Sequence, residues 1–243
     1  MPLLGSAAMI LSFDIVPESV TEHDEWHSRE HMPERLSVPG FRRGTRWVSP
    51  SRVPRYFVMY EVAELDVLGS AAYLERLNNP TPWTAKMMKG YRGMTRGLCV
   101  PTVGAGSGLG RMALLVRFAP APGREAELQH WLTYGLVPSV VARPGVVCAY
   151  LLERGLVPQM TAEQQIRGKD TDVRSVLLVT GYEADALTAL PEQVMSADAL
   201  WQHGAAQDQY AAGIYDLAFA LCDREVQKSA RSCGLTRKRG ARR

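Results

Sequence analysis

The sequence predicts an α+β protein made of two copies of one βαββαβ unit, whose two sheets close on each other within a single chain. Three observations support this prediction. The sequence aligns with itself at an offset of 105 positions without a gap, the same order of strands and helices is expected in residues 1–100 and 112–223, and a glycine-rich segment at 101–111 separates the two copies. The chain is therefore expected to contain repeat 1, a linker, repeat 2 and a tail at 224–243.

The internal repeat is recognised by matches between residues of the types that fix turns and hydrophobic cores. At the offset of 105, the identical residues include Phe13 with Phe118, Pro17 with Pro122, Trp26 with Trp131, Pro33 with Pro138, and Pro39-Gly40 with Pro144-Gly145. Sparse identities at one unbroken offset indicate duplication of a structural unit.

Each copy begins with an apolar strand and continues with a helix, a Pro-Gly turn, two strands, a second helix and a last strand. In repeat 1 the expected elements are a strand at 9–16, a helix opened by Thr21, strands at 41–48 and 55–62, a helix at 67–78 and a strand at 95–103. In repeat 2 they are a strand at 112–119, a helix opened by Arg124, strands at 146–152 and 174–182, a helical stretch around 186–202 and a strand at 214–221.

This order of elements is that of the ferredoxin-like unit, in which both helices cover one face of an antiparallel sheet. The other face must also be buried, and the sheet of the second copy is its obvious partner. The two tandem ferredoxin-like repeats are therefore expected to close into an intrachain α/β barrel, with 101–111 as a flexible linker.

The composition is that of a globular protein, with 46% hydrophobic and 22% charged residues among 243. No apolar run is long enough to span a membrane, and the N-terminus lacks the basic region of a signal peptide, so we expect a cytoplasmic protein. The four cysteines show no CxxC spacing and are expected to be reduced thiols.

The C-terminal tail at 224–243 is strongly basic, because it holds 8 of the 28 Lys and Arg residues and 1 of the 25 Asp and Glu residues. The tail therefore carries +7, and the remaining chain carries 20 − 24 = −4. A basic segment with few apolar residues is typical of a disordered tail. Nucleic acid is an unlikely partner because the body is not basic, whereas a homodimer through exposed strand edges stays open.

Three stretches of repeat 1 resemble a known superfamily. They are EHMPERLSVPGF at 30–41, YFVMYEV at 56–62 and YLERLNNPTPWT at 73–84. Together they resemble the dimeric α/β-barrel superfamily, especially its EthD-like and antibiotic-biosynthesis-monooxygenase-like members. The resemblance implies chemistry in the barrel interior on small aromatic or polyketide-like compounds, or haem binding in some branches. The GxxDG signature of the dye-decolourising peroxidases is absent from the sequence, which makes haem a minority possibility.

A stripe of histidines in repeat 1 is the strongest candidate for chemistry. His23, His27 and His31 are spaced four residues apart, and the repeat aligns them with Leu128, Leu132 and Leu136. Since leucine at this spacing marks the buried face of an amphipathic helix, the histidines are expected to face apolar surroundings. They could form a structural hydrogen-bond network, an acid/base site, or a metal or haem site, and the residues leave all three possibilities open.

The acid/base hypothesis assigns a role to each residue near the stripe. His27 or His31 would be the general acid or base, Glu30 or Glu34 would orient it, and Arg35 with Tyr60 would stabilise an oxyanion. His23 and four aromatic residues are expected to line the substrate cavity; the aromatic residues are Trp47, Tyr56, Trp83 and Tyr91.

The predicted function is accordingly proton transfer on a small hydrophobic compound, aromatic or carbonyl-bearing, by an isomerase, lyase or cofactor-free oxygenase. No cofactor is expected, with haem or a divalent metal as the minority alternative. A non-catalytic binding protein for such a compound is the other alternative.

Repeat 2 contains an insertion at 153–172, where repeat 1 has only 49–54. Such an insertion is either a surface excursion or a lid over the barrel end. Since repeat 2 lacks the polar residues of the stripe, repeat 1 is expected to carry the site and repeat 2 to act as scaffold.

Overall fold

The structure is a computed structural model that describes residues 3–49, 54–155, 161–167 and 170–228. The strands and helices of repeat 1 follow one another in the predicted order. Its strands are β1 (Ala7–Ile15), β2 (Phe41–Val48), β3 (Tyr56–Val62) and β4 (Tyr91–Gly106). Its helical elements are η1 (Pro17–Ser19), α1 (Val20–Trp26), η2 (His27–His31), α2 (Met32–Leu36), η3 (Leu65–Gly69), α3 (Ala71–Asn78) and α4 (Pro82–Met88).

Repeat 2 has the same order and one inserted helix. Its strands are β5 (Met112–Phe118), β6 (Val146–Arg154), β8 (Ser175–Gly181) and β9 (Ala211–Cys222). Its helical elements are α5 (Glu125–Trp131), η4 (Leu132–Leu136), α6 (Val137–Val141), α8 (Ala184–Thr188), η5 (Leu190–Glu192) and α9 (Ala197–Gln202). The insertion contributes α7 (Ala162–Arg167) and the short strand β7 (Thr171–Asp172).

The strands close into the predicted intrachain barrel. Neighbouring strands follow the order β1-β3-β2-β9-β5-β8-β6-β4, and β4 pairs back with β1, while β7 is added to β4 in parallel. The long strands β4 and β9 connect the two repeats, because the first part of each pairs within its own copy and the second part pairs with the other copy. Barrel closure leaves each of these strands hydrogen-bonded on both sides.

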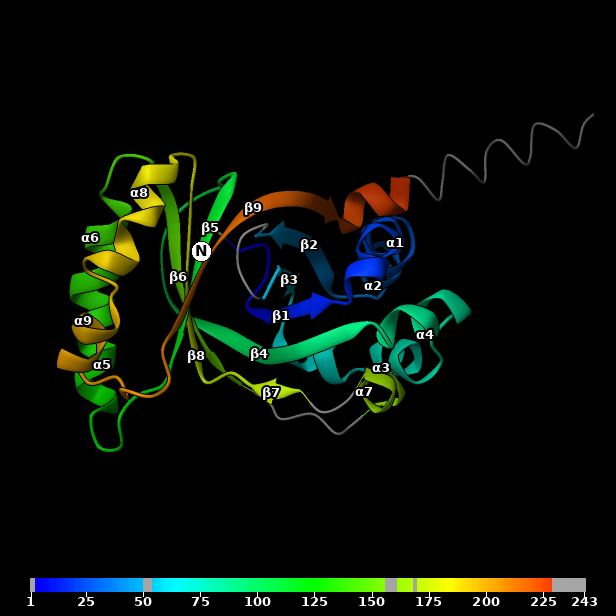
Figure 1. Ribbon diagram of the computed structural model, residues 1–243, viewed down its shortest axis with the longest axis horizontal. Coiled ribbons are helices and arrows are strands. Elements are labelled where there is room, and N and C mark those ends of the chain that lie inside the picture. Colours follow the sequence, from blue (N-terminus) through cyan, green and yellow to red (C-terminus); the bar gives the residue numbers. More distant parts are fainter. Residues whose placement is uncertain (1–2, 50–53, 156–160, 168–169, 229–243) are drawn as a thin grey trace, which may run out of the picture.

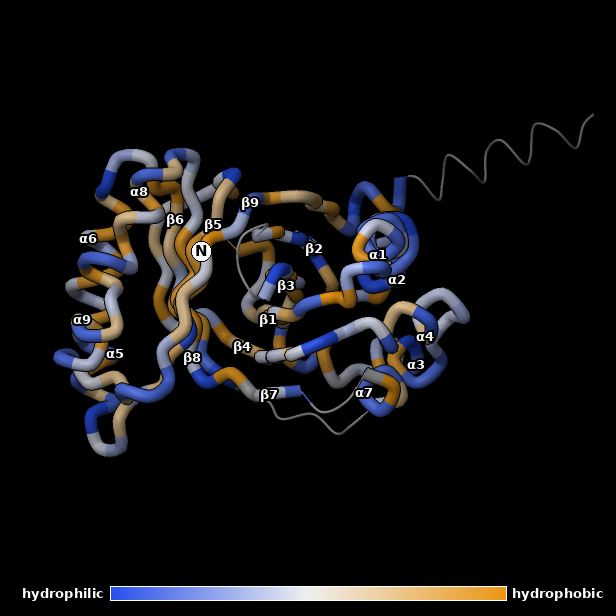
Figure 2. The backbone as a smooth tube through the Cα atoms, in the orientation of Figure 1, coloured by the Kyte–Doolittle hydropathy of each residue, from blue (hydrophilic) through white to orange (hydrophobic). Residues whose placement is uncertain are grey.

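The helices form two layers on opposite sides of the barrel (Figure 1). The layer of repeat 2 contains α5, α6, α8 and α9, and the layer of repeat 1 contains α1 to α4 together with α7 from the insertion. Figure 2 shows the hydrophobic residues concentrated along the strands and the inward helix faces. No helix in the part of the chain that the structure describes is long and apolar enough to cross a membrane.

Three hydrophobic clusters fill the spaces between these layers. One lies between the sheet and helices of repeat 1 and includes Trp26, Val58 and Tyr60. The second is its counterpart in repeat 2. The third fills the barrel interior with residues of the opposite strand faces, including Trp47 and Phe57. Because side chains alternate along a strand, β3 contributes Tyr56, Val58 and Tyr60 to the helix side and Phe57 and Met59 to the interior.

The first helix of each repeat contains one π-helical turn at the same position. In repeat 1 this turn is η2, where the Met32 N–H donates to the His27 carbonyl, and in repeat 2 it is η4. Each turn lies just before a proline, Pro33 or Pro138, which has no N–H and whose ring crowds the preceding carbonyls. The wider π-helical turn accommodates the proline, so the helix continues through it and does not end there.

Two predictions of segment structure are corrected. The segment at 101–111 is not wholly a linker, because β4 continues to Gly106 and pairs with β6, so that only 107–111 connect the repeats. The tail prediction is wrong for residues 224–228, which are helical, and 229–243 lie outside the described residues.

Candidate functional site

A small cavity lies between the sheet and the helices of repeat 1. It is lined by residues from β1, η2, α2, β3, α3, β4 and the α7 segment, namely Met9, Leu11, His31, Arg35, Tyr60, Tyr73, Leu77, Arg96, Thr161, Glu163 and Gln164. The space open to a water-sized molecule is about 30 Å³, which is room for about two waters. The site is thus on the helix side of the sheet, whereas the resemblance had implied the barrel interior.

His31 is the only member of the stripe that lines this cavity. Its ring lies against Trp26, with 4.4 Å between ring centroids, and His27 follows at 5.5 Å. The polar lining of the cavity therefore combines one imidazole with Tyr60 and Arg35.

The other two histidines are buried behind the cavity and bonded to tyrosines. His27 Nε2 lies 3.4 Å from the Tyr60 hydroxyl, and His23 Nε2 lies 3.3 Å from the Tyr91 hydroxyl. Burial lowers the pKa of His23 and holds the pKa of His27 well below its usual value, so both rings are neutral near pH 7. His27 and His23 fix the positions of the Tyr60 and Tyr91 hydroxyls, and neither histidine lines the cavity.

The burial of His27 makes the stability of the fold dependent on pH. The unfolded chain binds a proton at this imidazole below about pH 6.5, and the folded chain does not, so the free energy of unfolding falls as the pH drops below that value. His27 alone should contribute a loss of about 2 kcal/mol between pH 7.5 and pH 5. Urea unfolding at both pH values measures this loss.

The matched variant for this experiment is His27→Leu, which carries the residue of the repeat 2 counterpart, Leu132. It should lose less stability than the natural chain over the same pH interval, by about 2 kcal/mol. An equal loss in both chains would contradict the assignment.

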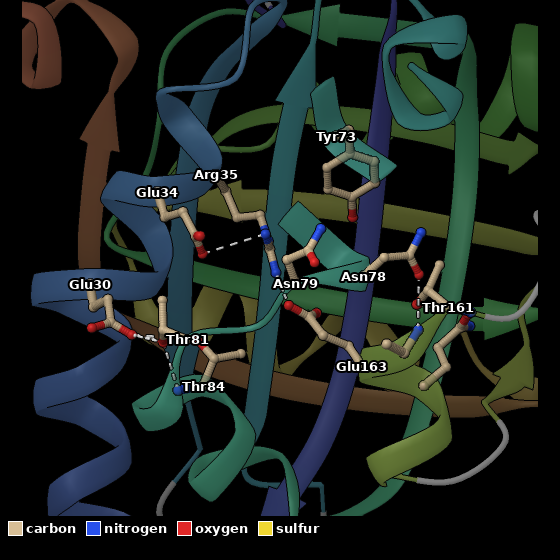
Figure 3. Close-up of polar contacts among 12 residues, drawn as sticks. Glu30, Glu34, Arg35, Tyr73, Asn78, Asn79, Thr81, Thr84, Thr161 and Glu163 are labelled. Carbon is tan, nitrogen blue, oxygen red and sulfur yellow. Dashed lines mark hydrogen bonds and ion pairs between the residues drawn. The ribbon is translucent and has the colours of Figure 1, made fainter. Parts of the chain in front are cut away.

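Arg35 connects the cavity to the insertion. Its side chain is 1% exposed, and its Nη2 donates to Glu163 Oε1 on α7, which is 2% exposed. Figure 3 shows the guanidinium between Glu163 and Glu34, whose Oε2 lies 3.5 Å from Nη1. Burial opposes the charge of Arg35, but Glu163, Tyr73, Glu34 and Tyr60 together outweigh this effect and raise the arginine pKa. Arg35 is therefore a cation held inside the protein.

The α7 segment, residues 161–167, covers the cavity. Besides the Arg35 pair, its Ala162 N–H donates to Asn78 Oδ1 at the end of α3, and Thr161 and Gln164 line the cavity wall. The insertion thus reaches back over the helix side of repeat 1, and α7 does not lie over the barrel end, where the sequence had suggested a lid. The rest of the insertion at 156–160 and 168–169 lies outside the described residues.

Arg96 is a second buried cation in the same cavity. It is 7% exposed, and its Nη1 makes no hydrogen bond to any residue in the described part of the chain. Residues Met94 and Leu98 on the same face of β4 belong to the apolar cluster under the helices. Sequence analysis missed Arg96, although an arginine between two core positions of one strand face is a signal of a functional or paired charge.

The remaining predicted residues lie away from the cavity. Glu30 accepts from Thr81 Oγ1, Trp83 donates from Nε1 to Glu22, and Tyr56 donates to Asp24. Trp47 lies in the barrel interior, on the other side of the sheet. Of the predicted residues, the structure therefore brings His31, Arg35 and Tyr60 together at the cavity, with His27 and Glu34 in contact with them.

A separate pocket opens at one end of the barrel interior, and no predicted site residue lines it. Its volume is about 160 Å³, and its lining includes Leu115, Arg117 and Tyr215. Its described lining contains no histidine and no carboxylate.

Four polar residues of the cavity have apolar counterparts in repeat 2. Strand pairing relates Tyr60 and Arg96 to their counterparts, because each pairs with a β1 residue whose equivalent on β5 is 105 positions later. The resulting pairs are His31 with Leu136, Arg35 with Val140, Tyr60 with Val179, and Arg96 with Ala212. The fold alone therefore does not require polar residues here.

The two histidines behind the cavity do not present a free Nε2 atom to a haem or a metal ion. The Nε2 atoms of His23 and His27 lie beside tyrosine hydroxyls. Among residues 3–49, 54–155, 161–167 and 170–228, no three His, Cys, Asp or Glu side chains are grouped so that they could hold a metal ion.

No protein-family model and no curated protein matches the sequence. Solved structures do share the fold. An anthrone oxidase-like protein is 11% identical, with 92% of this chain and 96% of that chain covered and a TM-score of 0.67. Monooxygenase candidates from Fusobacterium nucleatum and Lactobacillus acidophilus are 10% and 8% identical, with coverages of 88% and 89% of this chain and 93% and 96% of theirs, and TM-scores of 0.51 and 0.53.

These structures confirm the fold that the resemblance to the dimeric α/β-barrel superfamily implied. At such low identities the likeness is one of fold, and the chemistry of this chain has to be argued from its own residues.

Proposed function

We propose that the chain is an enzyme that transfers a proton on a small aromatic carbonyl compound in the cavity of repeat 1. The observation that supports this proposal is the grouping of an imidazole, a tyrosine hydroxyl and a buried guanidinium around one cavity, at positions where repeat 2 has only apolar residues. Buried polar groups that the fold does not require are retained for a reason other than packing.

His31 is the general base in this scheme. A ring nitrogen of His31 takes a proton from a carbon that is next to the carbonyl group or conjugated with it through a ring. The electron pair of that C–H bond forms a new carbon–carbon double bond, and an electron pair of the C=O bond moves onto the oxygen to give an enolate. Return of the proton to the same carbon completes an exchange, and return to a different atom completes an isomerisation. Neither step needs a redox cofactor.

Arg35 and Tyr60 are the groups that stabilise the enolate oxygen. Arg35 is a fixed cation whose side chain is buried, and a buried charge acts more strongly than one at the surface. Burial raises the pKa of Tyr60, so that its hydroxyl stays protonated and can donate a hydrogen bond. His27 holds this hydroxyl in place from behind the cavity.

An aromatic carbonyl substrate suits the lining, which combines these polar groups with Met9, Leu11, Tyr73 and Leu77. The name of the anthrone oxidase-like protein of similar fold suggests a first compound. Anthrone is a tricyclic aromatic ketone whose acidic methylene group lies across the central ring from the carbonyl group, and removal of one methylene proton gives the enolate through the conjugated rings.

The experiment that tests the proposal is deuterium uptake by anthrone in heavy water, followed by mass spectrometry, with an absorbance scan of the same protein sample. We expect uptake at the methylene carbon above the rate without protein, from protein without a haem band. Binding without increased uptake would favour a non-catalytic binding protein. Uptake that depends on a bound haem or metal would contradict the proposed mechanism.

A further inference from the structure

The two guanidinium groups of the cavity differ in their partners. Arg35 and Arg96 both line it, and Glu163 is the only carboxylate among its described lining residues, while Glu34 lies outside the lining with its Oε2 3.5 Å from Arg35 Nη1. Glu163 pairs with Arg35, and Arg96 Nη1 is buried without a hydrogen-bond partner in the described part of the chain. A buried guanidinium nitrogen without a partner is costly, and an anion in the cavity would relieve that cost.

The carboxylate that does face the cavity comes from the insertion. Glu163 and Arg35 are 128 residues apart in the chain, and α7 has no counterpart in repeat 1. The carboxylate of Glu163 therefore sits in the cavity as a group tethered to a separate segment, as Figure 3 shows. Any ligand larger than about two waters has to displace this segment in order to enter.

We propose that Arg96 and Arg35 form a binding site for the carboxylate of an aromatic acid, and that Glu163 occupies this site in the absence of the ligand. The inference rests on the proposed function only for the location of the site. It adds that the aromatic carbonyl compound also carries a carboxylate. It also adds a mechanism of entry, in which the ligand carboxylate replaces Glu163 at Arg35 and contacts Arg96. Arginine suits this role because its planar fork can bind a carboxylate through two hydrogen bonds.

The test uses a matched pair of probes, 1-naphthoate and its neutral amide, 1-naphthamide, with affinity measured by calorimetry on the full chain. The two probes have nearly the same shape and differ in charge. A hydrogen-bonded charge contributes about 10-fold to 100-fold in affinity. We therefore expect naphthoate to bind at least about 10-fold more tightly than naphthamide.

Two variants separate the roles of the charges. Arg96→Met should weaken naphthoate binding by about 10-fold to 100-fold and leave naphthamide binding unchanged. Glu163→Gln should strengthen naphthoate binding by about 10-fold, because the tethered competitor has lost its charge. The control is Arg117→Met, since Arg117 is a partly buried arginine of the barrel that does not line this cavity, and its loss should not change the preference for the acid.

Several results would overturn the inference. The first is equal binding of the two probes. The second is that neither probe binds to the natural chain or to Glu163→Gln. The third is weaker naphthoate binding to Glu163→Gln than to the natural chain. Thermal unfolding of every variant identifies one that has lost its fold, and Glu163→Gln keeps the test decisive if Arg96→Met is unfolded.

The binding test and the deuterium test fail independently. Uptake of deuterium by anthrone with no preference for naphthoate would refute the anion site alone. Preference for naphthoate without deuterium uptake would refute proton transfer alone.

Discussion

Replacing His31 with leucine is expected to abolish proton transfer without unfolding the protein. A positioned general base contributes about 10²-fold to 10⁴-fold to a rate, so deuterium uptake by the substrate should fall by a factor in this range. Leucine is the residue of the repeat 2 counterpart, Leu136, which is buried in an equivalent helix. The free energy of unfolding should therefore change by less than about 1 kcal/mol.

The control for this variant is His130→Leu, which removes an exposed histidine from the helix of repeat 2. Its rate of deuterium uptake should equal that of the natural chain. If His31→Leu retained the natural rate, His31 would not be the base. If it unfolded, His31 would be a structural residue.

Replacing Trp26 with alanine is expected to have the largest effect on stability. Trp26 is fully buried in the cluster of repeat 1, its Nε1 donates to Thr84 Oγ1, and its ring supports His31. Loss of a large core side chain costs about 3–5 kcal/mol, from lost burial and from the cavity that remains. Urea unfolding at pH 7.5 measures this loss.

The repeat provides a matched control at Trp131. This residue is only partly buried and stacks on His203, with ring centroids 4.1 Å apart. Trp131→Ala should lose about 1 kcal/mol, clearly less than Trp26→Ala. Equal losses would contradict the assignment of Trp26 to the core.

The fold was predictable because duplication provides two versions of each element. The strand at 41–48 is found with those bounds, and the Pro-Gly turns and matched tryptophans place the first helix of each copy. Glycines in 101–106 led to the incorrect prediction that this segment is part of a linker. Their segment nevertheless alternates, with Val103 and Ala105 packing on the cluster of repeat 2, and this period of two was a readable strand signal.

The candidate site was only partly predictable. The leucine counterparts of the histidines correctly indicated burial, and His31, Arg35 and Tyr60 do meet at one cavity. The sequence could not show that the cavity lies on the helix side of the sheet or that Glu163 reaches Arg35. A contact across 128 residues between a duplicated helix and an insertion leaves no local pattern in the chain.

The most direct test of the assignment of the site to repeat 1 is a crystal structure of the chain soaked with 1-naphthoate. We expect the compound between the sheet and the helices of repeat 1, with its carboxylate at Arg96 and Arg35, its ring beside His31, and Glu163 displaced. A compound bound only in the barrel-end pocket near Arg117 and Tyr215, with the Arg35 and Glu163 pair intact, would contradict the assignment.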